Sequence, residues 1–288
     1  GYYFYETTNG LNFRSWDNMV SVRGSYDRPT KQDFFYMPMN INKDVSNYDD
    51  KINHDYKSVE SYRFINNFHD VAAQTILGTY AHNVITHNLY DKSYQKINYN
   101  YEYEFAQTKH TEVANEKSSQ ERYAVAAGSF VDEDDKKISD YNESRVSLQS
   151  TTQFLHNEET GAGYGLNVQQ DGRKLAEGIS QQSQVVNGTL LTMVVKGQSY
   201  IEAGDLISFN MLAVDEKNRN NETDPQYSGK YVITKIRHHI NSKKYTMAIE
   251  CAKDSTKRGF TPNDFKIERN SNVPDLRNTY RAEEPDIT

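Results

Sequence analysis

The chain has 288 residues, of which 33 are basic and 40 are acidic, giving a formal net charge of -7. No apolar run approaches the ~18–20 residues that a membrane-spanning helix needs, which excludes a helical membrane protein. The acidic balance also lacks the basic charge that is typical of nucleic-acid-binding domains. The 22 Tyr and 12 Phe supply the apolar surface that disordered chains lack, whereas only 12 Leu argue against a helix bundle. The composition therefore predicts a folded, strand-rich protein.

The N-terminal residues predict a β-hairpin and a short helix. Aromatic and polar residues alternate from Tyr2 to Thr8, and Asn9-Gly10 is typical of a type I′ turn between two strands. Ser15 has the side chain of a helix cap and precedes a short apolar stretch. Further along we expect a strand at 33–36, a polar loop up to about residue 56, a helix at 58–77 that ends at Gly78, and strands at 79–90 and 94–105.

The rest of the chain predicts one more helix and a series of short strands. Residues 106–145 are polar and rich in charge. After them we expect strands at 146–154, 189–196, 206–212, 231–240 and 245–253, a helix at 173–186, and an extended tail from residue 260. Because Gly-Asp and Asn-Ser turns join the last strands, we expect a small antiparallel barrel or sandwich.

The residue types that usually carry catalysis or bind metals form no recognisable pattern. Cys251 is the single cysteine, which excludes an internal disulfide, and we interpret it as a small buried residue in a strand. His82 and His87 are predicted to lie on opposite faces of one strand, as are the adjacent His238 and His239, so neither pair can share a metal. The motifs HExxH and GxSxG do not occur. We therefore predict no catalytic, cofactor-binding or metal-ligating residues, no cofactor and no enzymatic activity.

Three further segments have an alternative chemical interpretation. Gly161–Gly165 lacks the Lys-Ser/Thr of a phosphate loop, and Asp132–Asp135 lacks the ligand spacing of a calcium loop, so both are predicted to be surface loops. The stretch Lys230–Arg258 is locally basic, which leaves nucleic-acid contact open, although alternation on strands favours a solvated face or a protein interface. Carboxylate pairs for glycoside cleavage also stay open, because they depend on geometry rather than spacing.

Several short segments between about Phe4 and Lys253 form an ordered set of motifs. They are Phe4–Thr7 with Gly10 and Phe13–Ser15, then Gly78–Ala81 with Ile85–Asn88 and Asp91-Lys92, then Tyr99, Tyr101 and Phe105, and finally Ala203–Ile207 and Ser228–His238. This set resembles the baseplate central hub proteins of large contractile-tailed (myovirus-type) bacteriophages. The last segment also resembles the spike proteins of contractile injection machines. Residues 106–185 show no such similarity.

The resemblance implies a structural role in the virion. Hub proteins of this kind form a homotrimeric ring at the end of the tail tube, with two related barrel domains in each subunit. We therefore expect a subunit that is made in the host cytoplasm and assembled into the tail baseplate. The expected partners are further copies of the chain, the central spike protein, the tail tube and tape-measure proteins, and surrounding baseplate proteins. DNA would be present only in transit through the lumen, and no stable membrane insertion is expected.

The resemblance also implies a division of the chain. The expected fold is mainly β with a few helices (α+β), with an antiparallel, tube-like β-barrel domain formed by residues 1–95 together with 187–256. Residues 96–186 would form an inserted domain, and 257–288 an extended C-terminal tail. Because the family carries another barrel upstream and this chain lacks an initiator Met, we expect it to be the later part of a longer protein. Two alternatives stay open: a tail-associated cell-wall hydrolase, and a carbohydrate- or receptor-binding tail module.

Overall fold

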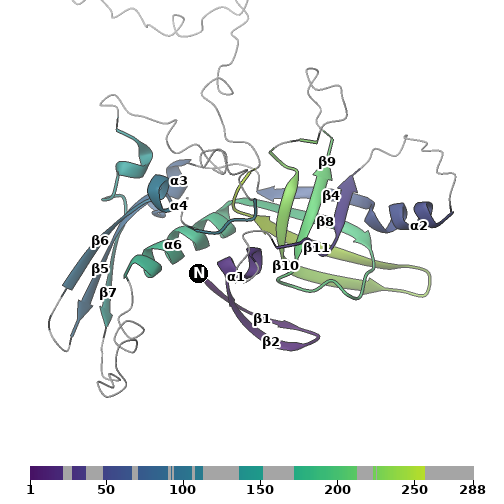
Figure 1. Cartoon of the computed structure of the whole chain (residues 1–288), viewed down its shortest axis with the longest axis horizontal. Helices are drawn as coiled ribbons and strands as arrows, with labels where there is room; N and C mark the ends of the chain where they lie inside the picture. The colour runs from purple at the N-terminus through teal and green to yellow at the C-terminus, as the bar shows by residue number, and fades with distance from the viewer. Residues whose placement is uncertain are drawn as a thin grey trace, which may run out of the picture.

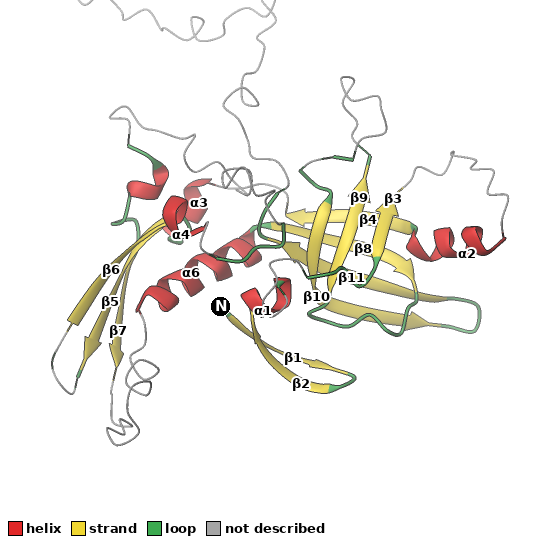
Figure 2. Ribbon diagram, in the orientation of Figure 1, coloured by secondary structure: helices red, strands yellow, loops and turns green. Residues whose placement is uncertain are grey.

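The computed structural model describes residues 1–21, 28–36, 48–66, 71–89, 92, 94–105, 108–112, 136–151, 172–212, 223–224 and 226–256. The fold is mostly β with a few helices, which confirms the predicted class (Figures 1 and 2). The strands are β1 (Tyr2–Thr7), β2 (Gly10–Ser15), β3 (Asp33–Tyr36), β4 (Val59–Asn66), β5 (Ala81–Asn88), β6 (Tyr94–Asn100), β7 (Val146–Thr151), β8 (Thr189–Lys196), β9 (Leu206–Met211), β10 (Gly229–Ile240) and β11 (Tyr245–Lys253). The helices are α1 (Trp16–Val20), α2 (Tyr48–Lys57), α3 (Val71–Ile76), α4 (Tyr101–Phe105), α6 (Gly172–Asn187) and the 3-10 turn η2 (Ile138–Asp140).

The largest sheet, called the barrel sheet below, has six strands in the order β3-β9-β10-β11-β8-β4. β3 runs parallel to β9, and the other neighbours are antiparallel. Its two edge strands meet at a parallel bridge between Phe35 and Ser58, where the rings of Tyr36 and Tyr62 lie 4.6 Å apart. β-Bulges, which bend strands and increase their twist, occur in β10 and β4. The sheet is therefore a nearly closed barrel.

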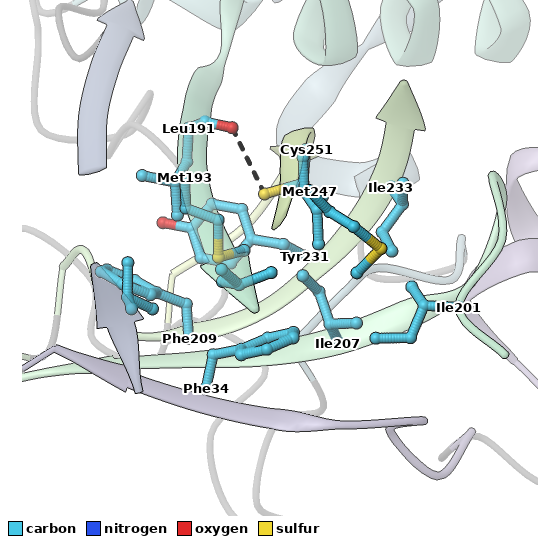
Figure 3. Close-up of a cluster of buried hydrophobic side chains, with 13 residues drawn as sticks. Phe34, Leu191, Met193, Ile201, Ile207, Phe209, Tyr231, Ile233, Met247 and Cys251 are labelled. Atoms are coloured by element: carbon cyan, nitrogen blue, oxygen red, sulfur yellow. Dashed lines mark hydrogen bonds between the residues drawn. The ribbon is translucent and has the colours of Figure 1, made fainter. Parts of the chain in front are cut away.

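The interior of the barrel is filled by alternate residues of its strands. In β8 and β11 every second side chain points inward, and Met193, Val195, Met247 and Ile249 are fully buried. Figure 3 shows Met193 and Met247 in this core with the aromatic rings of Phe34 (β3), Phe209 (β9) and Tyr231 (β10). Each such side chain stabilises the fold by roughly 1.5–3 kcal/mol relative to leaving it exposed. The barrel core therefore fixes the alternation of the strands, and with it the residues that face outward.

A second sheet, called the side sheet below, has the order β6-β5-β7. β5 is antiparallel to β6 and parallel to β7. Helix α6 covers one face of this sheet, where Ala176 packs with Tyr80, Val84 and Tyr99. The helix predicted at 173–186 is thus confirmed. The opposite face of the side sheet has no described element over it (Figure 1).

The hairpin β1–β2 is a separate two-stranded sheet that packs on the outside of the barrel. The predicted turn and the Ser15 cap are confirmed, since the Ser15 hydroxyl accepts a hydrogen bond from the amide of Asn18 at 3.3 Å. Trp16 of α1 is buried with Val185 of α6 and with Val232 of the barrel. This cluster joins the hairpin, α6 and the barrel.

Three predicted elements are wrong. Residues of the expected polar loop form α2, and the expected helix at 58–77 is β4 followed by the short α3. The expected strand at 94–105 ends at Asn100, whose side chain accepts a hydrogen bond from the Glu102 amide at 3.0 Å and so starts α4. Gly78 does end a helix, with a φ of 78°.

Other predictions fall on residues that the structure leaves undescribed. They are the glycine loop 161–165, the acidic run 132–135, residues 152–154 of a predicted strand and the tail after 256. The predicted domain division stays a prediction. Strand pairing places β5, from its first part, in one sheet with β6 and β7, so this sheet spans the predicted boundary at 95 and 96.

Candidate functional surfaces

The outer face of β4, β8, β10 and β11 is polar and carries cations. The inward residues of these strands fill the barrel, so the alternate residues face outward. Cross-strand register places Arg237 beside Ala248 and Lys235 beside Glu250, with Arg63 of β4 in the same row as Glu250. We call this surface the cationic face and define it by Arg63, Lys196, Lys235 and Arg237.

Carboxylates neutralise half of the cationic face. Lys235 lies 2.9 Å from a carboxylate oxygen of Glu250, and Lys196 lies 3.2 Å from one of Asp55 in α2. Arg63 and Arg237 have no carboxylate partner among the described residues. At one end of these strands, Leu190, Val232 and Ala252 are covered by the cluster around Trp16, and α2 borders the cationic face at Lys196. The surface is therefore open, polar and weakly basic.

The hairpin β1–β2 exposes one of its two faces. Tyr3 and Tyr5 pack toward the barrel, whereas Tyr2, Phe4, Leu11 and Phe13 are each 68–72% exposed. The rings of Tyr2 and Phe13 are stacked with centroids 5.2 Å apart, and Phe4 pairs across the strands with Phe13. We call this the hairpin face and define it by Tyr2, Phe4, Leu11 and Phe13. Exposed apolar surface of this size marks an interaction site more often than a solvated one.

The uncovered side of the side sheet is a second exposed apolar surface. Register places Ile85 of β5 between Leu148 of β7 and Lys96 of β6. Tyr94, Val146 and Leu148 are 77%, 56% and 74% exposed, and Ile85 is half-buried. We call this the side-sheet face and define it by Ile85, Tyr94, Val146 and Leu148.

A buried polar cluster surrounds Asp254, at the end of β11. One carboxylate oxygen accepts hydrogen bonds of 2.8 Å from the Trp16 indole and from the His110 imidazole, and the other accepts from the amide and hydroxyl of Thr111 at 3.0 and 2.9 Å. Burial raises the pKa of Asp254, but the interactions with His110 and the hydrogen bonds from Thr111 together outweigh burial, so the pKa lies below its usual value. The other ring nitrogen of His110, Nε2, lies within hydrogen-bond distance of the Thr108 hydroxyl, 2.9 Å away.

This chain of Thr108, His110 and Asp254 has the connectivity of a hydroxyl–histidine–carboxylate triad. The side chains of His110 and Asp254 are only 1% and 2% exposed. The same segment bonds the barrel at further points, because the Glu112 amide donates to Ser255 at 3.0 Å and its carboxylate accepts from the Lys230 amide at 2.6 Å. The hydrogen bonds of this cluster thus hold residues 108–112 against the barrel. Sequence reasoning missed it because His110 and Asp254 are 144 positions apart.

The structure places the residues considered in the sequence as follows. Cys251 is fully buried, donates to the Leu191 carbonyl at 3.4 Å (Figure 3), and burial raises the pKa of its thiol. The interpretation as a buried strand residue is confirmed. His82 is buried on the α6 side of β5 and His87 alternates to the other side, whereas His238 and His239 are exposed on β10.

The basic residues of Lys230–Arg258 lie on different sides of their strands, as the alternation of side chains predicted. Lys253 is buried and donates to the carbonyls of Gln226 and Ser228 at 2.6 and 3.0 Å, so it has a structural role. Lys244 pairs with Glu60 at 2.7 Å. Lys257 and Arg258 are not described.

Among the described residues, no group of three or more His, Cys, Asp or Glu side chains is placed to hold a metal ion. None of the described helices is long and apolar enough to span a membrane.

Comparison with known proteins gives little further information. No protein-family model matches the chain, and no curated protein matches it. Among solved structures, a tail protein from Neisseria meningitidis MC58 is 9% identical, with a TM-score of 0.36. The match covers 79% of this chain and 45% of that chain, so the chain spans less than half of that protein. A similarity this weak supports no argument about fold or function.

Proposed function

We propose that the chain is a structural subunit of a phage tail baseplate hub, located in the virion and without enzymatic activity. In this proposal it forms a homotrimeric ring that joins the tail tube to the central spike and lets DNA pass during ejection. The tape-measure protein and the surrounding baseplate proteins would be further partners. The observation that carries the proposal is the cationic face, an open strand surface on a nearly closed barrel.

The charge of the cationic face suits DNA in transit. Phosphate contacts by Lys and Arg dominate the affinity of DNA-binding proteins, and their strength rises with the number of cations. Because Glu250 and Asp55 neutralise two of the cations, only Arg63 and Arg237 are left to contact phosphates from this surface. A surface that lines a passage must hold DNA weakly, and a partly neutralised face meets this requirement.

The segments that resemble hub proteins also coincide with regular structure. Phe4–Thr7 and Phe13–Ser15 lie in the β1–β2 hairpin, and Ile85–Asn88 lies in β5. Ala203–Ile207 forms a turn into β9, and Ser228–His238 forms most of β10. These positions support the proposal because the motifs belong to ordered strands of the barrel and its neighbours.

The ring is tested with the full chain by native mass spectrometry and negative-stain imaging. We expect a closed trimer with a central opening, and a weak affinity for short duplex DNA that decreases with salt. The double variant Arg63→Glu with Arg237→Glu is expected to keep the ring and to lose the DNA contact. Monomers at every concentration would overturn the proposal. A ring whose DNA affinity ignores both substitutions would overturn the assignment of the cationic face.

The hairpin face gives one of the alternatives specific support. Exposed, stacked rings such as those of Tyr2 and Phe13 are a surface on which a sugar ring can lie. A carbohydrate-binding module would therefore bind isolated glycans through this face, and a glycan array with a Phe13→Ser variant tests it. The hydrolase alternative stays a prediction, which assays of cell-wall digestion would test.

A further inference from the structure

The chain exposes two apolar sheet faces that have no cover among the described residues, the hairpin face and the side-sheet face. We propose that the hairpin face of one copy docks on the side-sheet face of the next copy, and that this contact repeats around the ring. The inference rests on the proposed function and deepens it, because it names the surfaces that join the subunits.

The hairpin is held in a fixed position before any docking. At its turn, the Thr8 amide donates to the Glu202 carboxylate at 3.0 Å, and the Asn9 amide group donates to it at 3.4 Å. The Tyr5 ring on its inner side lies against Gly204. A surface that is already ordered loses less conformational entropy on binding.

The two faces match in form and length. Each is one side of a sheet, and two sheets pack face to face at a spacing of about 10 Å. Tyr2 to Glu6 on β1 and Tyr94 to Asn98 on β6 each span about 14 Å at the rise of an antiparallel strand. Phe4 and Phe13 lie at the middle of the first face, and Ile85 of the central strand β5 lies at the middle of the second, beside Leu148 of the edge strand β7.

The charges on the two faces favour contact between the hairpin face and the side-sheet face over contact between two hairpin faces. Register places Glu6 beside Leu11 on the hairpin face, and Lys96 beside Ile85 on the side-sheet face. No described residue forms an ion pair with Glu6 or Lys96. Two hairpin faces in contact would bring together like charges, whereas the proposed contact supplies a cation for the carboxylate.

The contact is heterologous, since it joins two different surfaces, and heterologous contacts form closed rings when the rotation between copies is right. The three aromatic side chains of the hairpin face leave roughly 300–500 Å² uncovered. A stable interface buries about 800 Å² on each partner. The hairpin therefore supplies around half of one side, with the remainder from flanking residues.

A mixing experiment tests the heterologous contact directly. The variants Phe13→Asp and Leu148→Asp each place a charge on an exposed position of one face, so both are expected to fold. We expect each variant alone to be monomeric, because every contact in its ring is damaged. An equimolar mixture retains one intact pair of faces, and is expected to form a dimer of one copy of each variant, detected by native mass spectrometry.

Ile240→Asp is the matched control, because Ile240 is 72% exposed but lies at the tip of β10. It is expected to leave the ring intact. A second measurement uses charge exchange: Glu6→Lys and Lys96→Glu are each expected to weaken assembly about tenfold or more, and the double variant to recover it. Rings that persist in Leu148→Asp would overturn the inference and leave the proposed ring standing. A native chain that is always monomeric would overturn both.

Discussion

His82 is a buried histidine that folding keeps neutral. Its Nδ1 donates to the Gly78 carbonyl at 2.7 Å, and its ring stacks on Tyr99. Burial lowers the pKa of His82 to about 4, the hydrogen bond to Gly78 acts in the opposite direction, and the charge of Arg145 adds to the lowering. The unfolded chain thus binds a proton that the folded chain excludes between pH 6.5 and about 4.

We therefore expect the free energy of unfolding to fall as the pH decreases from 6.5 to 4, by up to about 3 kcal/mol from His82 alone. Urea unfolding at pH 7 and pH 5 measures this loss. His82→Asn keeps a side-chain donor near Gly78 but does not titrate, so it should remove about 2 kcal/mol of the difference in the free energy of unfolding between the two pH values. The exposed His239→Asn is the control. An unchanged pH dependence in His82→Asn would show that this residue is not the source.

At the scale of elements, the turn before β9 couples the barrel to the hairpin. Gly204 has a φ of 80°, and its amide donates to the Ile233 carbonyl at 2.9 Å. A Cβ at this position would overlap the ring of Tyr5. Gly204→Ala therefore introduces both backbone strain and a steric overlap, and we expect it to destabilise the fold by roughly 2–3 kcal/mol in urea unfolding.

Gly10→Ala separates the two effects. Gly10 has a φ of 110°, but nothing lies within 4 Å of a Cβ built there. This variant is expected to cost only the backbone strain, on the order of 1 kcal/mol. Equal losses in the two variants would mean that the Tyr5 contact contributes nothing.

Strands with regular alternation were predictable from the sequence, and strands with bulges were not. β8 and β11 were both predicted at their observed bounds, the first as an apolar run and the second as an alternating strand with one buried face. In β4 the inward residues are Val59, Tyr62 and Phe64, because a bulge at Glu60 adds one residue to the first interval. The resulting step of three imitates the period of a helix, and it is the physical reason why the helix prediction at 58–77 was wrong.

Of the candidate surfaces, only one could be predicted from local sequence. The exposed face of the hairpin follows from its turn and its alternation, whereas the cationic and side-sheet faces depend on pairings between strands far apart in the sequence. Arg63 and Arg237 share one face only because β8 and β11 lie between their strands. Pairing between strands that are far apart in the sequence leaves no local pattern in the sequence.

At the scale of the whole molecule, Asp254 links three parts of the chain. Its carboxylate binds Trp16 of α1 and residues 108–112, and it follows directly after β11 of the barrel. A carboxylate that accepts five hydrogen bonds in a buried site stabilises the folded state only in its charged form. Because the folded pKa is below the usual value near 4, this stability is present above pH 4 and is lost as the pH falls through the folded pKa.

Asp254→Asn keeps the shape of the side chain but replaces one acceptor with a donor, which then faces a donor of Trp16, His110 or Thr111. We expect a loss on the order of 3 kcal/mol in urea unfolding at pH 7, and faster hydrogen exchange in residues 108–112 and in α1 than in β8. The native chain should also lose more stability than the variant below pH 4. Asp33→Asn, at an exposed carboxylate 2.9 Å from the Thr30 hydroxyl, should change little. Exchange that rises equally in β8 would mean that Asp254 supports the barrel alone and does not join the parts.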